Sequence, residues 1–110
     1  MQIELLYFQG CPSAEPFVPR LRELLAETGI TEPLRLRRVE SVHDAERERF
    51  LGSPTLRVNG RDVEPGATER NDFGLKCRLY RTPSGTAGTP PEDWVRRALQ
   101  TTAEGATRDG

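Results

Sequence analysis

The sequence predicts a single α/β domain in which a mixed four-stranded sheet carries helices on its faces, and its 110 residues leave no room for a second domain. An almost continuous apolar run at 3–8 is typical of a strand buried on both faces. The residues after it recur with the spacing of an amphipathic helix. Asn59–Gly60, between two short strand-like runs, is a strong hairpin signal.

The first two elements are a strand at 3–8 and a helix that Ser13 is placed to cap. A mostly apolar stripe follows along this helix: Phe17, Leu21, Leu24, Leu25 and Thr28. Gly29 is expected to end the helix, and Pro19 inside it should introduce a kink.

The middle of the chain is expected to complete the sheet. Residues 34–39 alternate for a few positions and form the second strand, which must run parallel to the first because a helix connects the two. Ser41, with an aspartate three residues later, resembles a capping box that opens a short polar helix to about Phe50. Residues 52–58 and 61–64 then form an antiparallel hairpin.

The last third of the chain is less regular. Residues 66–88 lack a clear periodicity and are interpreted as an insertion that carries Cys77. The segment 89–92 starts a final helix, with one side formed by Trp94, Val95, Ala98 and Leu99. The order β-α-β-α-β-β-α therefore spans a domain at 1–100, and the small polar residues 101–110 are expected to be a disordered tail.

Composition excludes several classes of function. The net charge of −1 lacks the basic surplus of a nucleic-acid binder. No apolar run approaches the roughly 20 residues of a membrane span, and no basic cluster precedes the first apolar run as in a signal peptide, so we expect a cytoplasmic protein. Two cysteines and one histidine cannot supply a four-ligand structural zinc site without carboxylates, so no metal and no cofactor are expected.

Cys11 is the residue most suited to chemistry. It follows the first strand and precedes a helix, where the first amide groups and the helix dipole favour an anion such as a thiolate. Gly10 and Pro12 on either side favour an exposed turn and a reactive cysteine. The alternative is an inert buried cysteine, the common state of this residue type.

Three features together resemble the thioredoxin fold. The segment 10–14 occupies the place of the Cys-x-x-Cys loop of that family, and Pro19 matches a helix-kinking proline. The stretch 52–55, followed by the Asn-Gly hairpin, resembles the family's Gly-x-Pro-Thr strand. The resemblance covers roughly residues 3–64 and the final helix.

The resemblance implies a cis peptide bond before Pro54, with Ser53 facing Cys11. The backbone N–H of Ser53 would then be available to an extended substrate segment or to a small thiol. We expect substrate to contact the residues around the cysteine and this proline: Gly10, Pro12, Ser13, Ser53 and Pro54.

The sequence departs from the family at Ala14, which replaces the second cysteine of the loop. Cys11 therefore acts with an external thiol, or it is resolved by Cys77 from the insertion. Lys76 and Arg78 beside Cys77 would favour its thiolate. A packing role for Cys77 stays open as well, because its other neighbours are Leu75, Leu79 and Tyr80.

A closer resemblance is to small bacterial proteins with a Gly-Cys-Pro loop and a later Asp-Phe/Tyr-Gly…Cys-Arg stretch, matched here at 72–78. Some are named thioredoxin-like, some alkylmercury-lyase-like, and one family has selenocysteine at the position of Cys11. Cleavage of a carbon–mercury bond needs two soft thiolates and an acid, which Cys11, Cys77 and Asp72 could supply.

The sequence therefore predicts a thiol-dependent oxidoreductase whose nucleophile is Cys11, with Cys77 as the candidate resolving residue. Its partner would be a small molecule or a protein that carries a thiol, a disulfide or a peroxide-type group. Two alternatives stay open: an organomercury or soft-metal thiol protein, and a binding module that keeps the fold without catalysis.

Overall fold

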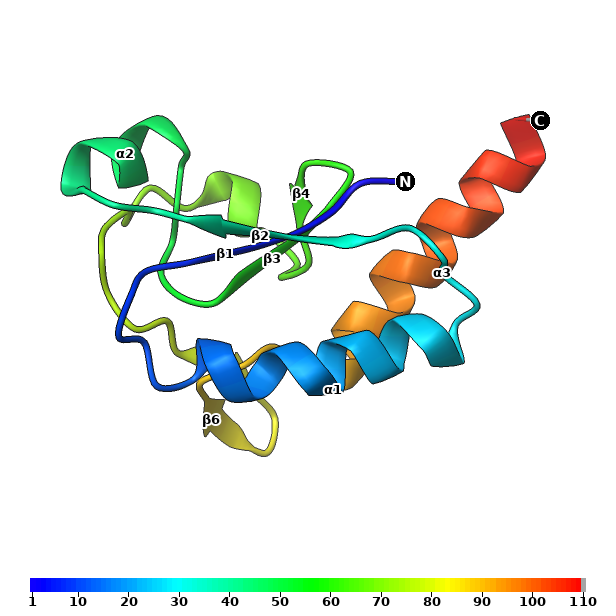
Figure 1. The fold of residues 1–110 in the computed structure, drawn as a ribbon, viewed down its shortest axis with the longest axis horizontal. Coiled ribbons are helices and arrows are strands. Elements are labelled where there is room, and N and C mark those ends of the chain that lie inside the picture. Colours follow the sequence, from blue (N-terminus) through cyan, green and yellow to red (C-terminus); the bar gives the residue numbers. More distant parts are fainter. Residues whose placement is uncertain (110) are drawn as a thin grey trace.

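The computed structural model describes the backbone of residues 1–109 and the side chains of residues 1–100. It has the mixed α/β architecture that the sequence predicts, with a four-stranded sheet and helices on both faces (Figure 1). The strands of this sheet are β1 (Ile3–Tyr7), β2 (Leu34–Arg38), β3 (Thr55–Val58) and β4 (Arg61–Asp62). The helices are α1 (Ala14–Glu27), α2 (Val42–Arg47) and α3 (Glu92–Asp109).

The sheet has the strand order β2-β1-β3-β4, which makes β1 central. The strand β1 is parallel to β2, with Ile3 opposite Leu34, and antiparallel to β3, with Ile3 opposite Val58. The hairpin between β3 and β4 turns at Asn59 and Gly60, whose φ angles of 52° and 80° are the positive values that a tight type I′ turn requires. The parallel pair and the hairpin are both confirmed.

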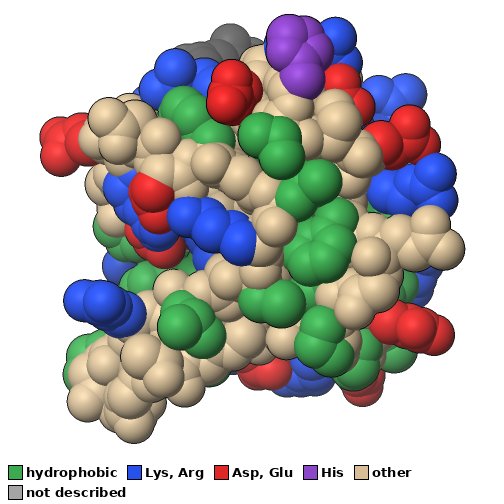
Figure 2. Space-filling model, turned by 90° about the vertical axis from the view of Figure 1, so that its left-hand side faces the viewer, with side chains coloured by type: hydrophobic (Ala, Val, Ile, Leu, Met, Phe, Trp, Pro, Cys, Tyr) green, Lys and Arg blue, Asp and Glu red, His purple; other side chains and the backbone are tan. Residues whose placement is uncertain are grey.

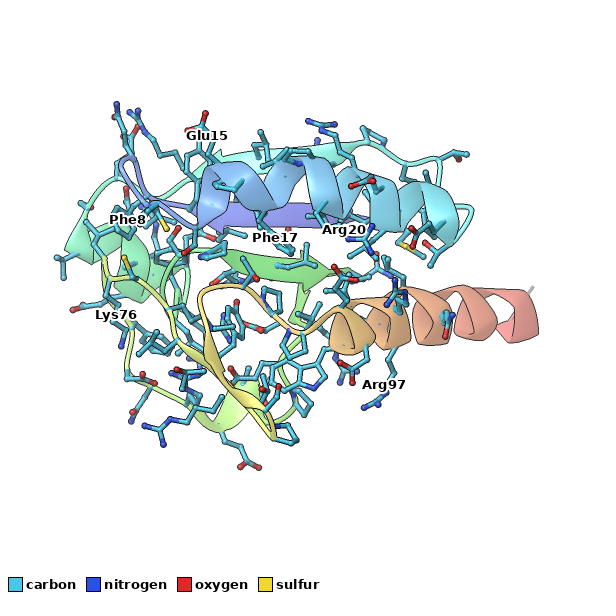
Figure 3. The ribbon with its side chains drawn as sticks, turned by 90° about the horizontal axis from the view of Figure 1, so that it is seen from below. Phe8, Glu15, Phe17, Arg20, Lys76 and Arg97 are labelled. Atoms are coloured by element: carbon cyan, nitrogen blue, oxygen red, sulfur yellow. The ribbon has the colours of Figure 1, made fainter. Side chains whose placement is uncertain are left out.

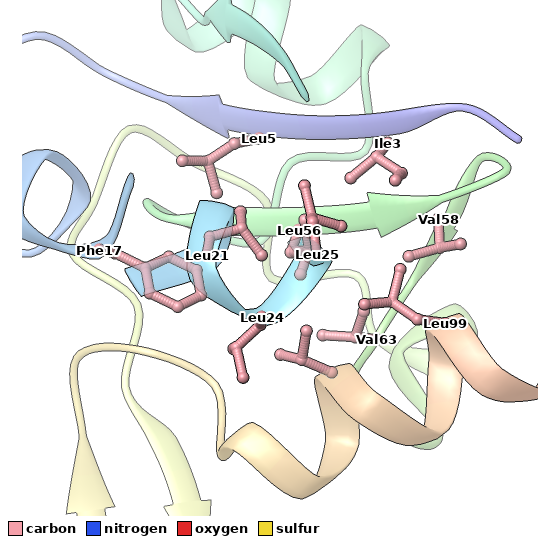
Figure 4. Close-up of a cluster of buried hydrophobic side chains, with 11 residues drawn as sticks. Ile3, Leu5, Phe17, Leu21, Leu24, Leu25, Leu56, Val58, Val63 and Leu99 are labelled. Atoms are coloured by element: carbon pink, nitrogen blue, oxygen red, sulfur yellow. The ribbon is translucent and has the colours of Figure 1, made fainter. Parts of the chain in front are cut away.

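The helices are divided between the two faces of the sheet: α1 and α3 cover one face and α2 lies over the other (Figure 1). The main core lies between the sheet and the two helices α1 and α3 (Figure 4). Its buried members are Ile3, Leu5, Phe17, Leu21, Leu24, Leu25, Leu56, Val58, Val63, Val95 and Leu99. A smaller cluster on the face toward α2 contains Leu6, Val39, Ala45 and Phe50, so β1 buries side chains on both faces, as its apolar run predicted.

Of the two serine caps that the sequence predicts, the one at Ser41 is present and the one at Ser13 is not. Ser41 Oγ accepts a hydrogen bond of 3.0 Å from the Asp44 N–H, which confirms the cap of α2. Ser13 stands at the N-cap position of α1 but makes no side-chain cap, because its backbone is already helical. The helix α1 continues through Pro19 to Glu27.

The segment that lacks periodicity is more ordered than the sequence suggests. It forms a short 3-10 helix, η1 (Ala67–Glu69), and a separate hairpin of β5 (Tyr80–Thr82) and β6 (Gly85–Ala87). The final helix α3 continues to Asp109, through most of the stretch for which the sequence predicted disorder. None of the helices within the described residues is long and apolar enough to cross a membrane.

Candidate functional site

Cys11 lies in the turn between the end of β1 and the start of α1. Its side chain is 6% exposed, while Gly10 and Pro12 beside it are exposed. The expectation of an exposed cysteine is therefore wrong for the side chain, because the thiol turns inward and donates a hydrogen bond of 3.5 Å to the backbone carbonyl of Ser53. The flanking residues of this turn are therefore exposed while the cysteine between them is buried.

Ser53 lies two residues before the start of β3 and is fully buried. The peptide bond between Ser53 and Pro54 is cis and Ser53 contacts Cys11, which confirms two expectations. The availability of Ser53 to a substrate is not confirmed. Its N–H donates to the Lys76 carbonyl at 2.8 Å, and its carbonyl accepts from the Arg78 N–H at 3.0 Å. These two bonds form a parallel bridge, so part of this chain already occupies the backbone groups expected to pair with substrate.

The bridge places Cys77 directly opposite Ser53. The carbonyl oxygen of Ser53 is shared, because it accepts from the Cys11 thiol and also from the N–H that follows Cys77. From these two hydrogen bonds and standard backbone dimensions, the Cα atom of Cys77 lies at most about 9 Å from Sγ of Cys11. The structure thus brings together the two cysteines that the sequence singled out, and it leaves Cys77 exposed while Cys11 is buried.

A buried arginine anchors the segment that carries Cys77. The side chain of Arg78 has no exposed surface, and its guanidinium donates to Asp62 at 2.7 Å, to Glu64 at 3.2 Å and to Thr55 Oγ1 at 2.9 Å. It also lies 4.5 Å from the centre of the Tyr80 ring. A buried arginine of this kind needs such partners, since an unpaired charge in the interior is costly.

Tyr80 adds a second anchor, at the residue that follows Ser53. Its hydroxyl donates to the carbonyl of Pro54, and burial raises the pKa of this phenol well above its usual range, so it remains a donor. Sequence reasoning missed the roles of Arg78 and Tyr80. The available signal was a pair of acids at the end of the hairpin, Asp62 in its return strand and Glu64 just after it, but nothing local indicates which cation they bind.

Gly52 permits the close approach of this segment to the sheet. A Cβ atom at Gly52 would lie 3.0 Å from the Arg78 Cβ and 3.1 Å from the Lys76 carbonyl, and the φ angle of Gly52 is +126°. We therefore expect Gly52→Ala to destabilise the fold by about 3 kcal/mol, combining backbone strain with the displacement of the 76–78 segment. Urea unfolding at pH 7 measures the loss.

Gly60→Ala is the matched control for this prediction. Gly60 also has a positive φ of +80°, but a Cβ atom there meets nothing within 4 Å. Its cost should be limited to backbone strain, about 1 kcal/mol. Equal losses in the two variants would show that the approach of the 76–78 segment does not constrain Gly52.

Two cavities flank the cysteines. One of about 310 Å³ is lined by Cys11 and by apolar side chains from the end of β1, the first turns of α1 and the middle of β2, among them Tyr7, Phe8, Ala14, Val18 and Leu36. The other, of about 640 Å³, is lined by Cys77 and a mixture of charged and apolar groups. Figure 2 views this end of the molecule and shows several hydrophobic side chains exposed between charged ones.

Of the other expected site residues, Gly10 lines the first cavity. Ser13 is half-buried at the start of α1. Gly88 packs closely against it: a Cβ atom at Gly88 would lie 2.4 Å from Ser13 Oγ. Figure 3 shows Phe8 and Lys76 at the same end of the molecule as Glu15 in the first turn of α1. The segment 66–88 therefore packs beside the Cys11 turn at two places, at Ser53 and at Ser13.

Asp72 is poorly suited to the role of a proton donor. Its carboxylate accepts hydrogen bonds from Arg70 at 2.7 Å and from Lys76 at 3.0 Å, and these contacts hold the pKa of Asp72 well below its usual range. An acid that cleaves a carbon–mercury bond must carry a proton at neutral pH. Within the part of the chain whose side chains are described, no three metal-ligating groups lie close enough to hold a metal ion.

Comparisons with protein-family models, with curated proteins and with solved structures found no match to this chain. The fold and the site define the chain as a mixed α/β protein with a cysteine at the start of its first helix.

Proposed function

We propose that the protein is a thiol-dependent oxidoreductase in which Cys11 is the nucleophile and Cys77 resolves the mixed disulfide. One observation carries the proposal. The thiol of Cys11 and the backbone that bears Cys77 meet on the same carbonyl oxygen, that of Ser53. Intramolecular resolution of a mixed disulfide needs a second thiol near the first, and this arrangement supplies one.

The start of α1 supports the role of Cys11. The amide groups of Ala14 and Glu15 belong to the first turn of this helix, where they have no partner within the helix and favour a negative charge. The cavity of about 310 Å³ gives a small molecule access to the buried sulfur. The order of the strands and the turn before the helix resemble a thioredoxin-like protein, and we propose that fold for the chain.

The proposed reaction has two exchange steps. The Cys11 thiolate attacks a substrate disulfide, forms a mixed disulfide and releases one thiolate. The Cys77 thiolate then attacks Sγ of Cys11 and releases the second, so the substrate gains two electrons and the protein loses two. The two hydrogen bonds to the Ser53 carbonyl allow the two Cα atoms to be at most about 12 Å apart. A disulfide needs them within roughly 7 Å, so this second step requires the exposed stretch around Cys77 to shift by up to about 5 Å.

Disulfide mapping tests the proposal. When the reduced protein is treated with one equivalent of hydroxyethyl disulfide, we expect two equivalents of free mercaptoethanol and a peptide that contains Cys11 joined to Cys77. The Cys77→Ser variant should stop at the mixed disulfide on Cys11 and release one equivalent. Mass spectrometry of non-reduced peptides identifies both products.

Two results would contradict this prediction. A wild-type protein that accumulates mixed disulfides on both cysteines would show that Cys77 does not resolve Cys11. If Cys11 stays unmodified under conditions that label Cys77, then Cys11 is not the nucleophile. The fold would then serve as a binding module rather than an enzyme.

A further inference from the structure

The bridge at Ser53 limits the class of molecule that can approach the site. An extended polypeptide would need the backbone N–H and carbonyl of Ser53, but Lys76 and Arg78 occupy them. The segment is held there by the buried Arg78 guanidinium. A substrate or reductant that binds without backbone pairing, as a small molecule does, meets no such obstacle.

The cavity beside Cys77 has a size suited to a small molecule. Its volume of about 640 Å³ lies within the range of roughly 300–1,000 Å³ that is usual for ligand sites. Its apolar wall contains Leu51, Leu79 and Trp94, and Leu79 is 65% exposed. An exposed leucine in the same lining as a tryptophan provides apolar surface that a ligand can cover.

The charged groups of this cavity favour an anion. Its lining has four cationic side chains, Arg70, Lys76, Arg78 and Arg81, against the two acids Glu64 and Asp72. A third acid, Asp62, lies outside the lining and forms an ion pair with Arg78. The four positive charges therefore face three negative ones, which leaves one positive charge in excess. That excess lies on Arg81, which is exposed and has no ion pair among the residues whose side chains are described.

The positions of the two sulfurs decide where an external thiol reacts. In a disulfide between Cys11 and Cys77, the Cys77 sulfur belongs to the exposed residue and borders this cavity, while Cys11 is buried. A thiolate attacks the disulfide sulfur that it can reach, so we expect the attack at Sγ of Cys77. The ligand's sulfur should therefore lie beside Cys77, with its carboxylates toward Arg81.

We propose that this cavity binds the reductant, a low-molecular-weight thiol that carries carboxylate groups. The inference rests on the proposed oxidoreductase function and names the class of molecule that reduces the enzyme. The thiolate attacks Sγ of Cys77 in the protein disulfide, forms a mixed disulfide there and releases the Cys11 thiolate. A second molecule of the same thiol attacks the ligand sulfur, which releases the Cys77 thiolate and a small disulfide, so two thiols supply the two electrons.

Trp94 provides a direct test, because it lines the cavity and is the single tryptophan of the chain. The probe is S-methylglutathione, which has a net negative charge at pH 7 and no thiol. We expect saturable quenching of tryptophan fluorescence by this probe. Arg81→Gln should weaken binding about fivefold, and 0.5 M salt should weaken it by a similar factor, because the attraction is that of exposed charges.

Two matched controls accompany the titration. Arg35→Gln removes another exposed strand arginine, one that is absent from the lining of the cavity, and should leave the affinity unchanged. The dimethyl ester of the probe lacks both carboxylates and should bind at least about tenfold more weakly. A probe that does not saturate, or an affinity that changes equally in Arg81→Gln and Arg35→Gln, would overturn the inference.

This experiment separates the inference from the function on which it rests. The probe carries no thiol, so its binding does not depend on the reactivity of Cys11 or Cys77. The oxidoreductase function fails if mapping finds no Cys11–Cys77 disulfide. The reductant site fails if that disulfide forms but the titration shows no charge-dependent binding at Arg81.

Discussion

Replacing Cys11 with serine is expected to lower the catalysed reduction of a small aromatic disulfide by at least about a thousandfold. The serine hydroxyl does not ionise near neutral pH and cannot form a disulfide, so the first exchange step is lost. The rate is measured from the absorbance of the released aromatic thiol, with reduced glutathione as the electron donor and the uncatalysed rate subtracted. No other cysteine lines the cavity that leads to this sulfur.

Two further variants make this result interpretable. Cys77→Ser should retain a single rapid turnover, since it still has Cys11, but lose steady-state rate. Cys11→Ala keeps the buried position apolar, so its urea midpoint shows whether the loss of rate comes from unfolding. Retention of the wild-type rate in Cys11→Ser would exclude Cys11 as the nucleophile and favour the non-catalytic binding module.

Replacing Arg78 with methionine is expected to destabilise the fold by about 3–5 kcal/mol, since the variant leaves Asp62 and Glu64 without their buried cation. The methionine fills most of the apolar volume of the arginine stem, so the loss comes mainly from the charges. The free energy of unfolding is measured in urea at pH 7. The same variant should also release the Ser53 backbone from the segment that it anchors.

Arg81→Met is the matched control for this variant. Arg81 is close in sequence and exposed, so its replacement should change the free energy of unfolding by less than about 0.5 kcal/mol. Neutralising the acids as well, in the variant Arg78→Met, Asp62→Asn, Glu64→Gln, should recover part of the stability. A loss in Arg78→Met no larger than in Arg81→Met would show that this buried network does not hold the segment.

The sheet could be predicted from sequence because its signals are local. The apolar run around Ile3 indicates a central strand whatever lies beyond it, and Asn59–Gly60 specifies a turn through its own backbone preferences. The boundaries are less accurate, since strand ends depend on the neighbouring strands. The return strand β4 ends at Asp62, two residues earlier than expected, and Glu64 beyond it forms an ion pair with Arg78 instead.

The position of Cys11 at the start of a helix was also predictable from the residues. The resemblance to the thioredoxin fold implied the cis bond before Pro54 and the contact with Ser53, and the structure has both. The burial of the thiol was not. Glycine and proline on either side correctly indicate a turn, but the direction of a side chain in a turn depends on what fills the space beneath it. Here the Ser53 carbonyl provides an acceptor, and the thiol turns toward it.

The sequence by itself therefore determined the α/β sheet, the hairpin and the helix that begins after Cys11, because each depends on neighbouring residues and their periodicity. Only the tertiary structure decided that Cys77 lies opposite Ser53 and that Arg78 is buried. Both result from hydrogen bonds and ion pairs between residues far apart in the chain, in a segment without periodicity. A charged residue that looks solvated in sequence becomes an anchor once two acids from a distant part of the chain pair with it.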